Sequence, residues 1–481
     1  MSNIKTEMDV DNPNKRYGLK ATLAQILATL AQSFLLIGLG MELTMPTVVI
    51  QEVYQNSKSQ FSLTPTEVSW YGSVLYVFHP IGSFISGFLQ ERFGRKRCMI
   101  FANVPSIFGW ILLYYSHTTI SLYTSTVLMG MSIGFSEAPI LSYVGEITEP
   151  KLRGSMTSLA SMTSMLGSLI VFTLRYYFSN WRTVALLSTL CPLTCICLIL
   201  LIPESPIWLV GKGKIEKAEK ALCWLRGWVD SETIKSEYCE LIRYNELSGT
   251  RGNDGKVNTG DTGLFVKLRE FKDPAVYRPL RLVMVLFLIS NMISLAPCKP
   301  FINNIMTEIG ILDDQNLILV CSGVLQFIGC LSVMLLIRYS GKRIMSLSSF
   351  SISTVLVLLF GVYIVALKSN YIVSTPWIPI TIYCGISYFS TSAVGLPWML
   401  ISEIFPNKSR GLASGTCAGL GYLLMFVLTK SYLPVKSFLS LEYSIFIFGI
   451  IGVFGIVIVY FCLPETENKT LLEIENFFLK N

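Results

Sequence analysis

The sequence predicts an all-α membrane protein whose twelve transmembrane helices form two six-helix bundles. The first observation is composition: of 481 residues, 52% are hydrophobic and only 14% are charged, and the mean hydropathy is +0.55, which is unlike a soluble domain. The second is a series of segments that are long and apolar enough to cross a bilayer core of about 30 Å. The third is that short motifs of the first half return in the second half, as in bundles built from a repeated unit.

Each predicted span is a run of about 18 or more predominantly apolar residues, and polar segments separate it from the next span. The first six spans are 22–46, 68–89, 99–117, 122–145, 155–177 and 183–203. The last six spans are 280–303, 316–337, 345–367, 376–400, 412–432 and 443–463. The two groups of six are the predicted bundles.

Polar stretches divide the chain into five parts. They are a tail at 1–21, the N-terminal bundle at 22–203, a linker at 204–279, the C-terminal bundle at 280–463 and a tail at 464–481. In the linker, Lys212 to Trp228 has a helical pattern, whereas Ser248 to Gly263 is rich in Gly, Asn, Asp and Thr. We therefore expect short helices followed by a flexible connection.

Basic residues at alternate span ends predict the orientation. Lys15, Arg16 and Lys20 precede the first span, and further Lys and Arg residues follow the second, fourth, eighth and tenth spans. Because loops rich in Lys and Arg remain in the cytosol, we expect a multi-pass protein of the plasma membrane with both termini and the linker in the cytosol. The first twenty residues lack the apolar core and cleavage site of a secretory signal.

Several function classes are disfavoured. The net charge of +7 is explained by topology, without nucleic-acid binding. Most of the 12 cysteines lie inside spans and show no C-x-x-C spacing, which indicates packing rather than disulfides or a metal site. The two histidines, His79 and His117, have no neighbouring Ser/Asp or Cys partner. The sequence therefore predicts no enzyme, no metal and no cofactor.

Three motifs occur once in each half, and each lies where a span is expected to leave the membrane on the cytosolic side. The pairs are Gly94-Arg95-Lys96 with Gly341-Lys342-Arg343, Glu146/Arg153-Gly154 with Glu403/Arg410-Gly411, and Pro203-Glu204-Ser205 with Pro464-Glu465-Thr466. Acidic and basic ends of the two halves could meet there and close the inner mouth. Exposed ion pairs contribute only about 0.2 to 1 kcal/mol each. Several such pairs would give the small free-energy difference between the two conformations that alternating access requires.

These motifs, in this order, resemble those of the sugar transporter family of the major facilitator superfamily. The resemblance rests on Gly87 to Lys96, Tyr143 to Glu146, Pro203 to Pro206, Pro397-Trp398 and Pro464 to Thr466, together with the Glu and Arg-Gly repeats. It covers nearly the whole chain and implies the major facilitator fold. Within the family, Gly421 to Phe426 and Pro297 to Phe301 resemble insect facilitated trehalose transporter-like proteins.

The predicted cytosolic gate consists of charged residues from these motifs. They are Glu91, Arg92, Arg95, Glu146, Arg153, Lys342, Arg343, Glu403 and Arg410. If these charges served only to orient the protein in the membrane, the basic residues would be explained. The glutamates at a repeated spacing would not be explained.

Polar residues near the middle of the spans are the candidates for substrate binding. A rise of about 1.5 Å per helical residue places Ser161, Asn291 and Gln326 at one level near the midplane. Intramembrane polar side chains tend to face the bundle interior, although each of these could instead bond a neighbouring helix.

Two carboxylates within spans are possible proton carriers. Glu137 is predicted near the midplane, where it would be neutral unless paired; it could bind a substrate hydroxyl, exchange a proton or serve a structural role beside Pro139. Glu42 is predicted near the outer interface on a solvated face.

The resemblance adds further binding candidates and some departures. It implies that Trp398 packs against the sugar and that Tyr422 replaces the family's usual Trp. The family's polar residues on the fifth, seventh and tenth spans are replaced by Ser161, Ser290 with Asn291, and Ser390. These losses argue against a plain glucose carrier.

The predicted function is alternating-access transport of a neutral sugar, trehalose or a hexose, by facilitated diffusion through the lipid bilayer. One alternative is a proton-coupled carrier of sugar or of another small organic solute. A second alternative is a nutrient sensor that binds sugar and signals through the linker without net transport. The sequence does not predict an oligomeric state.

Overall fold

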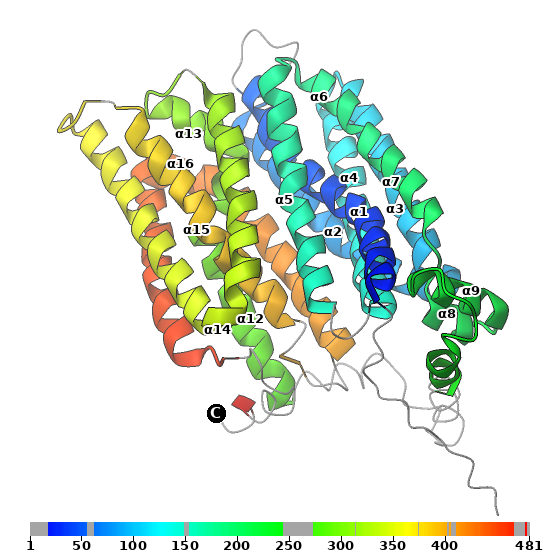
Figure 1. Cartoon of the computed structure of the whole chain (residues 1–481). Coiled ribbons are helices and arrows are strands. Elements are labelled where there is room, and N and C mark those ends of the chain that lie inside the picture. The colour runs from blue at the N-terminus through cyan, green and yellow to red at the C-terminus, as the bar shows by residue number, and fades with distance from the viewer. Residues whose placement is uncertain are drawn as a thin grey trace, which may run out of the picture.

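The computed structural model is predominantly helical, and its two halves lie side by side (Figure 1). It describes residues 18–54, 62–148, 153–243, 273–312, 314–373, 375–401, 404–405, 410–465 and 477–478. In Figure 1 the blue to blue-green helices form the N-terminal bundle, the bright green to red helices form the C-terminal bundle, and the dark green helices at the lower right belong to the linker. These two groups of helices are the two bundles of the predicted fold class.

The N-terminal bundle is built from seven helices. They are α1 (Gly18–Val53), α2 (Pro65–Phe93), α3 (Arg95–Tyr114), α4 (Thr119–Ile147), α5 (Arg153–Tyr177), α6 (Trp181–Ser188) and α7 (Leu190–Leu201). The last two follow each other directly and form one apolar segment, Trp181–Leu201.

The C-terminal bundle contains longer elements. They are α12 (Pro274–Ile293), the 3-10 helix η2 (Ala296–Phe301), α13 (Ile302–Glu308), α14 (Gln315–Lys368), α15 (Trp377–Ile401) and α16 (Arg410–Cys462). Two of these continue through a sharp break, since Gly341 in α14 has φ 73° and Ser440 in α16 has φ 67°. Each therefore supplies two helical segments.

Ten segments of the described chain are long and apolar enough to cross a membrane. The last of them, Ala413–Cys462, has 50 residues and contains the break at Ser440, so it provides two crossings. Helix α5, with 25 residues, completes the set of twelve that the sequence predicts.

Local chemistry explains where several helices begin. Thr64 and Glu67 form a reciprocal capping box at the start of α2, and Asp273 caps α12 just before Pro274. The predicted span 280–303 lies within the apolar segment Pro274–Glu308, but it is not one continuous α-helix. Helix α12 ends at Ile293, Leu295 adopts φ 54°, and the following segment is 3-10 helix because it contains Pro297 and Pro300.

The linker contains two short helices, α8 (Pro206–Gly211) and α9 (Ile215–Leu225), and a further helical segment at 235–243. They lie at one end of the N-terminal bundle (Figure 1), which we call the linker end; the opposite end is the distal end. The Gly- and Asn-rich part of the linker that was predicted to be flexible lies outside the described residues.

The two bundles are joined at the distal end. The hydroxyl of Ser69 on α2 donates to the carbonyl of Lys430 on α16 at 2.7 Å, and the Lys430 ammonium lies 4.2 Å from the centre of the Trp70 ring. Nearby, the hydroxyl of Thr47 on α1 donates to the carbonyl of Lys299 in η2 at 3.3 Å. These contacts close the distal end of the interface between the bundles.

Candidate functional site

A cluster of four side chains lies where the two bundles meet, deeper along α2 than the distal contacts. His79 Nε2 lies 3.0 Å from Glu137 Oε2, which pairs α2 with α4 inside the N-terminal bundle. Tyr422, on α16 of the other bundle, stacks on the His79 ring with centroids 3.5 Å apart, and its hydroxyl donates to Glu137 Oε1 at 3.5 Å. The Trp398 ring of α15 lies 5.2 Å from the Tyr422 ring. We call these four residues the central cluster.

Close packing of α4 on α2 positions the acidic part of the cluster. Gly134 of α4 lies against the backbone of α2, and a methyl group at this position would overlap the carbonyl oxygen of His79. Because residues three or four apart lie on one face of a helix, Glu137 sits one turn along from this contact. The glycine thus brings the carboxylate within hydrogen-bonding distance of the imidazole.

The C-terminal bundle supplies the aromatic part. Phe287 of α12 packs edge-on against Trp398, with centroids 5.0 Å apart and an interplanar angle of 76°. Its ring also lies close to Gly421, where a Cβ atom would approach it to 3.0 Å. These contacts hold the Trp398 and Tyr422 rings next to each other.

The cluster combines two kinds of recognition. Trp398 is half-buried and offers part of an apolar ring, while the Glu137 side chain is 19% exposed and offers carboxylate oxygens. Nδ1 of His79 is buried and has no hydrogen-bond partner in the described part of the chain. A flat apolar face beside hydrogen-bonding groups is what a carbohydrate requires, because its C–H groups and hydroxyls lie on different faces.

The other predicted binding residues occupy different environments. Ser290 is buried and donates to the carbonyl of Phe287 in its own helix at 3.2 Å, and Ser390 is also buried. Asn291 and Gln326 are half-buried. Gln326 lies one turn from Gly323, the point where α14 packs against Phe172 of α5, so it lies near the second contact between the bundles.

The repeated charges at the linker end make a network inside the N-terminal bundle. The guanidinium of Arg95 donates to Glu146 Oε1 through Nε at 3.0 Å and through Nη2 at 2.7 Å. The Ser205 hydroxyl donates to the other oxygen of the same carboxylate. Both charged side chains are 15% exposed, so this pair is better shielded from water than an ordinary surface ion pair.

A second repeated contact caps one helix in each half. The Glu204 carboxylate accepts from the backbone N–H of Lys96 at 3.0 Å. In the other half, Glu465 accepts from the N–H groups of Lys342 and Arg343 at 3.1 and 3.0 Å. In both places a carboxylate accepts hydrogen bonds from first-turn N–H groups of a helix that begins after a glycine. The N-terminus of a helix is favourable for negative charge.

Several predicted gate residues have different surroundings. Glu91 and Arg92 are exposed, whereas Lys342 is buried. Arg343 also donates from its side chain to the carbonyl of Tyr460 at 2.6 Å. Glu403 lies outside the described residues, and so do the side chains of Arg153, Ser161 and Arg410. The contact of Arg95 with Glu146 lies within one bundle, so closure between the bundles at the linker end stays a prediction.

Two features escaped the sequence analysis. His79 has a carboxylate partner that no local pattern reveals, because Glu137 lies 58 residues further along the chain. The prediction that Glu42 lies on a solvated face is wrong, since the residue is 1% exposed and accepts a hydrogen bond from Ser106 at 2.5 Å. Glu42 faces α3 rather than the surface.

Comparison with known proteins gives consistent matches along the chain. A family model described as sugar (and other) transporter matches residues 21–478. The facilitated trehalose transporter Tret1 of Bombyx mori is 28% identical over 487 residues, covering 98% of this chain and 91% of the relative. Facilitated glucose transporter member 6 of solute carrier family 2 from Homo sapiens is 27% identical over 495 residues. The match covers 97% of this chain and 92% of the relative.

Solved structures of the xylose transporter XylE share the fold. XylE described as a proton:xylose symporter, bound to 6-bromo-6-deoxy-D-glucose, aligns with a TM-score of 0.71 and 17% identity over 95% of this chain and 99% of its own. An inward open conformation of XylE from E. coli aligns with a TM-score of 0.71 and 18% sequence identity. This alignment covers 93% of this chain and 98% of the XylE chain. At this level of identity the likeness shows the fold alone.

Proposed function

The chain belongs to the sugar (and other) transporter family, and on that premise we propose that it carries trehalose or a hexose across the membrane by facilitated diffusion. Relatives named as facilitated trehalose and glucose transporters along nearly the whole chain support this proposal. The substrate is a neutral sugar, and lipid is the surrounding solvent of both bundles.

The observation that carries the proposal is the central cluster. Trp398 and Tyr422 of one bundle meet His79 and Glu137 of the other, so a sugar bound there would touch both moving parts. The Trp398 face would pack against sugar C–H groups, and Glu137 would accept hydrogen bonds from hydroxyls. Neutral sugars fit this site because the Glu137 carboxylate can accept a hydrogen bond from a sugar hydroxyl while it keeps its contact with His79.

Asn291, Gln326, Ser290 and Ser390 are proposed to complete the sugar site, together with Ser161. Among the described residues no side chain hydrogen-bonds the amide of Gln326, and its half-buried position beside the α5–α14 contact makes that amide available to a ligand. An intramembrane amide is costly to leave unpaired. Asn291, Ser290 and Ser390 would hold the sugar from the C-terminal bundle, and Ser161 would contribute from α5 of the N-terminal bundle.

The mechanism we propose is alternating access around the central cluster. The distal contacts of Ser69, Trp70 and Lys430 close one side of the interface, and breaking them would expose the site on that side. We propose that the linker end is cytosolic, that the protein lies in the plasma membrane, and that the charged residues of the predicted gate close the linker end in the opposite state.

Countertransport in proteoliposomes tests this function. Vesicles loaded with unlabelled trehalose or glucose should transiently accumulate the labelled sugar above its equilibrium level, because each return of the carrier brings labelled sugar inward. Trp398→Ala should reduce this exchange, and Trp398→Phe should keep part of it. Sugar binding without exchange would contradict a carrier and favour a sensor.

The bond between His79 and Glu137 favours one further candidate, proton-coupled sugar transport. A titratable pair at the meeting point of the bundles could take up a proton in one state and release it in the other. In that case an imposed pH gradient would drive sugar accumulation, and Glu137→Gln would abolish accumulation while sparing exchange. A passive carrier would instead show transport that is nearly independent of the pH gradient.

A further inference from the structure

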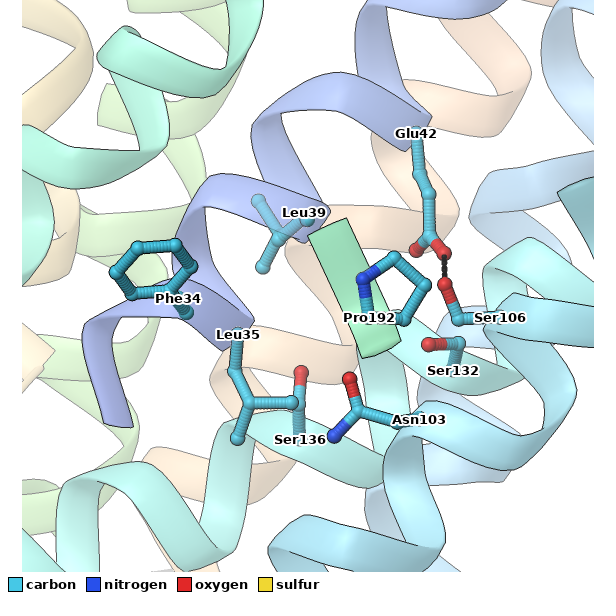
Figure 2. Close-up of a pocket in the computed structure, with 10 residues that line it drawn as sticks. Phe34, Leu35, Leu39, Glu42, Asn103, Ser106, Ser132, Ser136 and Pro192 are labelled. Atoms are coloured by element: carbon cyan, nitrogen blue, oxygen red, sulfur yellow. Dashed lines mark hydrogen bonds between the residues drawn. The ribbon is translucent and has the colours of Figure 1, made fainter. Parts of the chain in front are cut away.

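The N-terminal bundle holds a second polar site, separate from the central cluster. A small cavity of about 10 Å³ lies between α1, α3, α4 and α7 (Figure 2). Its polar wall consists of Glu42, Asn103, Ser106, Ser132 and Ser136. A cavity of this size holds about one water-sized particle. All these helices belong to one bundle, so the sugar pathway between the bundles does not explain the site.

The polar groups around this cavity direct their protons away from it. The Ser132 and Ser136 hydroxyls donate to the backbone carbonyls of Ala102 and Ile133 at 3.0 and 2.7 Å. The Asn103 amide nitrogen donates to the carbonyl of Met99 at 2.8 Å. The lone pairs of these three groups are left for the cavity, and Figure 2 shows Ser132 on the Glu42 side of it and Asn103 and Ser136 at its other end. The wall is therefore rich in acceptors.

The same wall lacks a positive partner for the carboxylate. None of the ten residues that line the cavity is basic. The Ser106 hydroxyl donates to Glu42 Oε1 at 2.5 Å. On α7 the facing titratable groups are Cys191 and Cys195, whose sulfur atoms bond the carbonyl of Phe34 and the Asn103 amide. A carboxylate buried in this way stays ionised only beside a compensating positive charge, and otherwise a proton neutralises it.

We propose that this cavity is a binding site for a small monovalent cation, with Na⁺ as the physiological ligand, held by the Glu42 carboxylate and the oxygens of Asn103, Ser106 and Ser132. Three observations combine in its favour: one carboxylate, several neutral oxygen acceptors and an enclosed space. Divalent ions in all-protein sites usually have several carboxylate ligands, and here there is one. A proton on Glu42 would neutralise the carboxylate and leave the cavity to a water molecule, which is the alternative that the test below distinguishes.

Such an ion would tie α1 to α3 and α4 within the N-terminal bundle. Because it binds the folded bundle and not the unfolded chain, its binding should stabilise the fold in proportion to the logarithm of its concentration. The site is independent of the proposed sugar transport, since its residues do not include any member of the central cluster.

The test compares thermal unfolding of the purified full-length protein in NaCl and in choline chloride, at equal ionic strength and fixed pH. We expect the unfolding temperature to rise with Na⁺ and to saturate, and radiolabelled Na⁺ to bind stoichiometrically. Glu42→Gln should lose both effects. Ser132→Ala, which keeps the carboxylate but removes one oxygen, should weaken Na⁺ binding several-fold, so the proposal stays testable if the first variant folds poorly.

Glu137→Gln is the matched control, because it removes another intramembrane carboxylate but lies in the central cluster; its response to Na⁺ should equal that of the wild type. A Na⁺ response that survives in Glu42→Gln would overturn the proposal. So would an unfolding temperature that depends on pH but is identical in NaCl and choline chloride, since that result assigns the cavity to a protonated Glu42 beside a water molecule.

Discussion

Tyr422→Phe removes one atom at the point where the two bundles meet and leaves the ring in place. The stacking on His79 and the contact with Trp398 persist, because both involve the ring. The hydrogen bond from the Tyr422 hydroxyl to Glu137 is lost. This bond crosses between the bundles, so it must break whenever they separate at this level.

The expected size of the effect follows from the geometry. A hydrogen bond to a charged group contributes about 1.5 to 3 kcal/mol, and the 3.5 Å separation places this one at the weak end. Losing about 1.4 kcal/mol from the state in which the bundles touch changes the ratio of the two states by about tenfold. A resting population with about 1% of the other state would then show about 10% of it.

Double electron–electron resonance can measure this shift. Nitroxide labels at Ser62 and Ser437, both exposed near the distal end, report the separation of the two bundles in a background without reactive cysteines. In Tyr422→Phe the long-distance population should grow at the expense of the short one. Initial rates of sugar exchange should change in the same samples.

Tyr388→Phe is the matched control. The hydroxyl of Tyr388 donates to Ser332 at 3.0 Å, and both residues belong to the C-terminal bundle, so its loss should not alter the distance distribution. An unchanged distribution in Tyr422→Phe would refute the argument. Equal shifts in the two variants would show that any lost tyrosine hydroxyl loosens the protein.

Three further predictions concern the Trp398 ring, the helix caps formed by Glu204 and Glu465, and the ion pair of Glu146 with Arg95 at the linker end. Trp398→Ala should raise the half-saturation concentration for sugar about five- to tenfold, a loss of about 1 kcal/mol or more, measured by uptake; equal loss in Trp398→Phe would indicate a structural role. Glu204→Gln and Glu465→Gln should each lower the free energy of unfolding by about 1 kcal/mol, because each weakens a carboxylate contact with helix N–H groups; an effect in only one variant would argue against equivalent caps. Glu146→Gln should break the pair with Arg95 and increase thiol labelling from the linker end, whereas unchanged labelling would reject a role in closing that end.

The sequence predicts part of the central cluster but not its pairing. Trp398, Tyr422 and Glu137 were separate candidates, and the structure brings all three together. The partner of Glu137 was missed because His79 reaches it only through the packing of α2 on α4. Helical spacing within one segment carries no information about which other segment lies opposite, so this pair required the fold.

Depth along a helix was easier to predict than the direction of a side chain. A rise of about 1.5 Å per residue locates Glu42 along α1, but it does not tell which neighbour the side chain faces. The structure turns it toward Ser106 of α3. The break after α12 was similarly hidden by an apolar run, although Pro297 and Pro300 in that run were the signal against a continuous helix.

The most direct test of the central claim is whether sugar protects a thiol beside the site, and from which side the thiol is reached. Gln326→Cys, in a background without other reactive cysteines, would be treated with a membrane-impermeant thiol reagent applied to each side of proteoliposomes. Alternating access at a site between the bundles predicts labelling from both sides, slowed from both by trehalose or by the transported hexose. Labelling from one side only, or at a rate that sugar does not change, would contradict it.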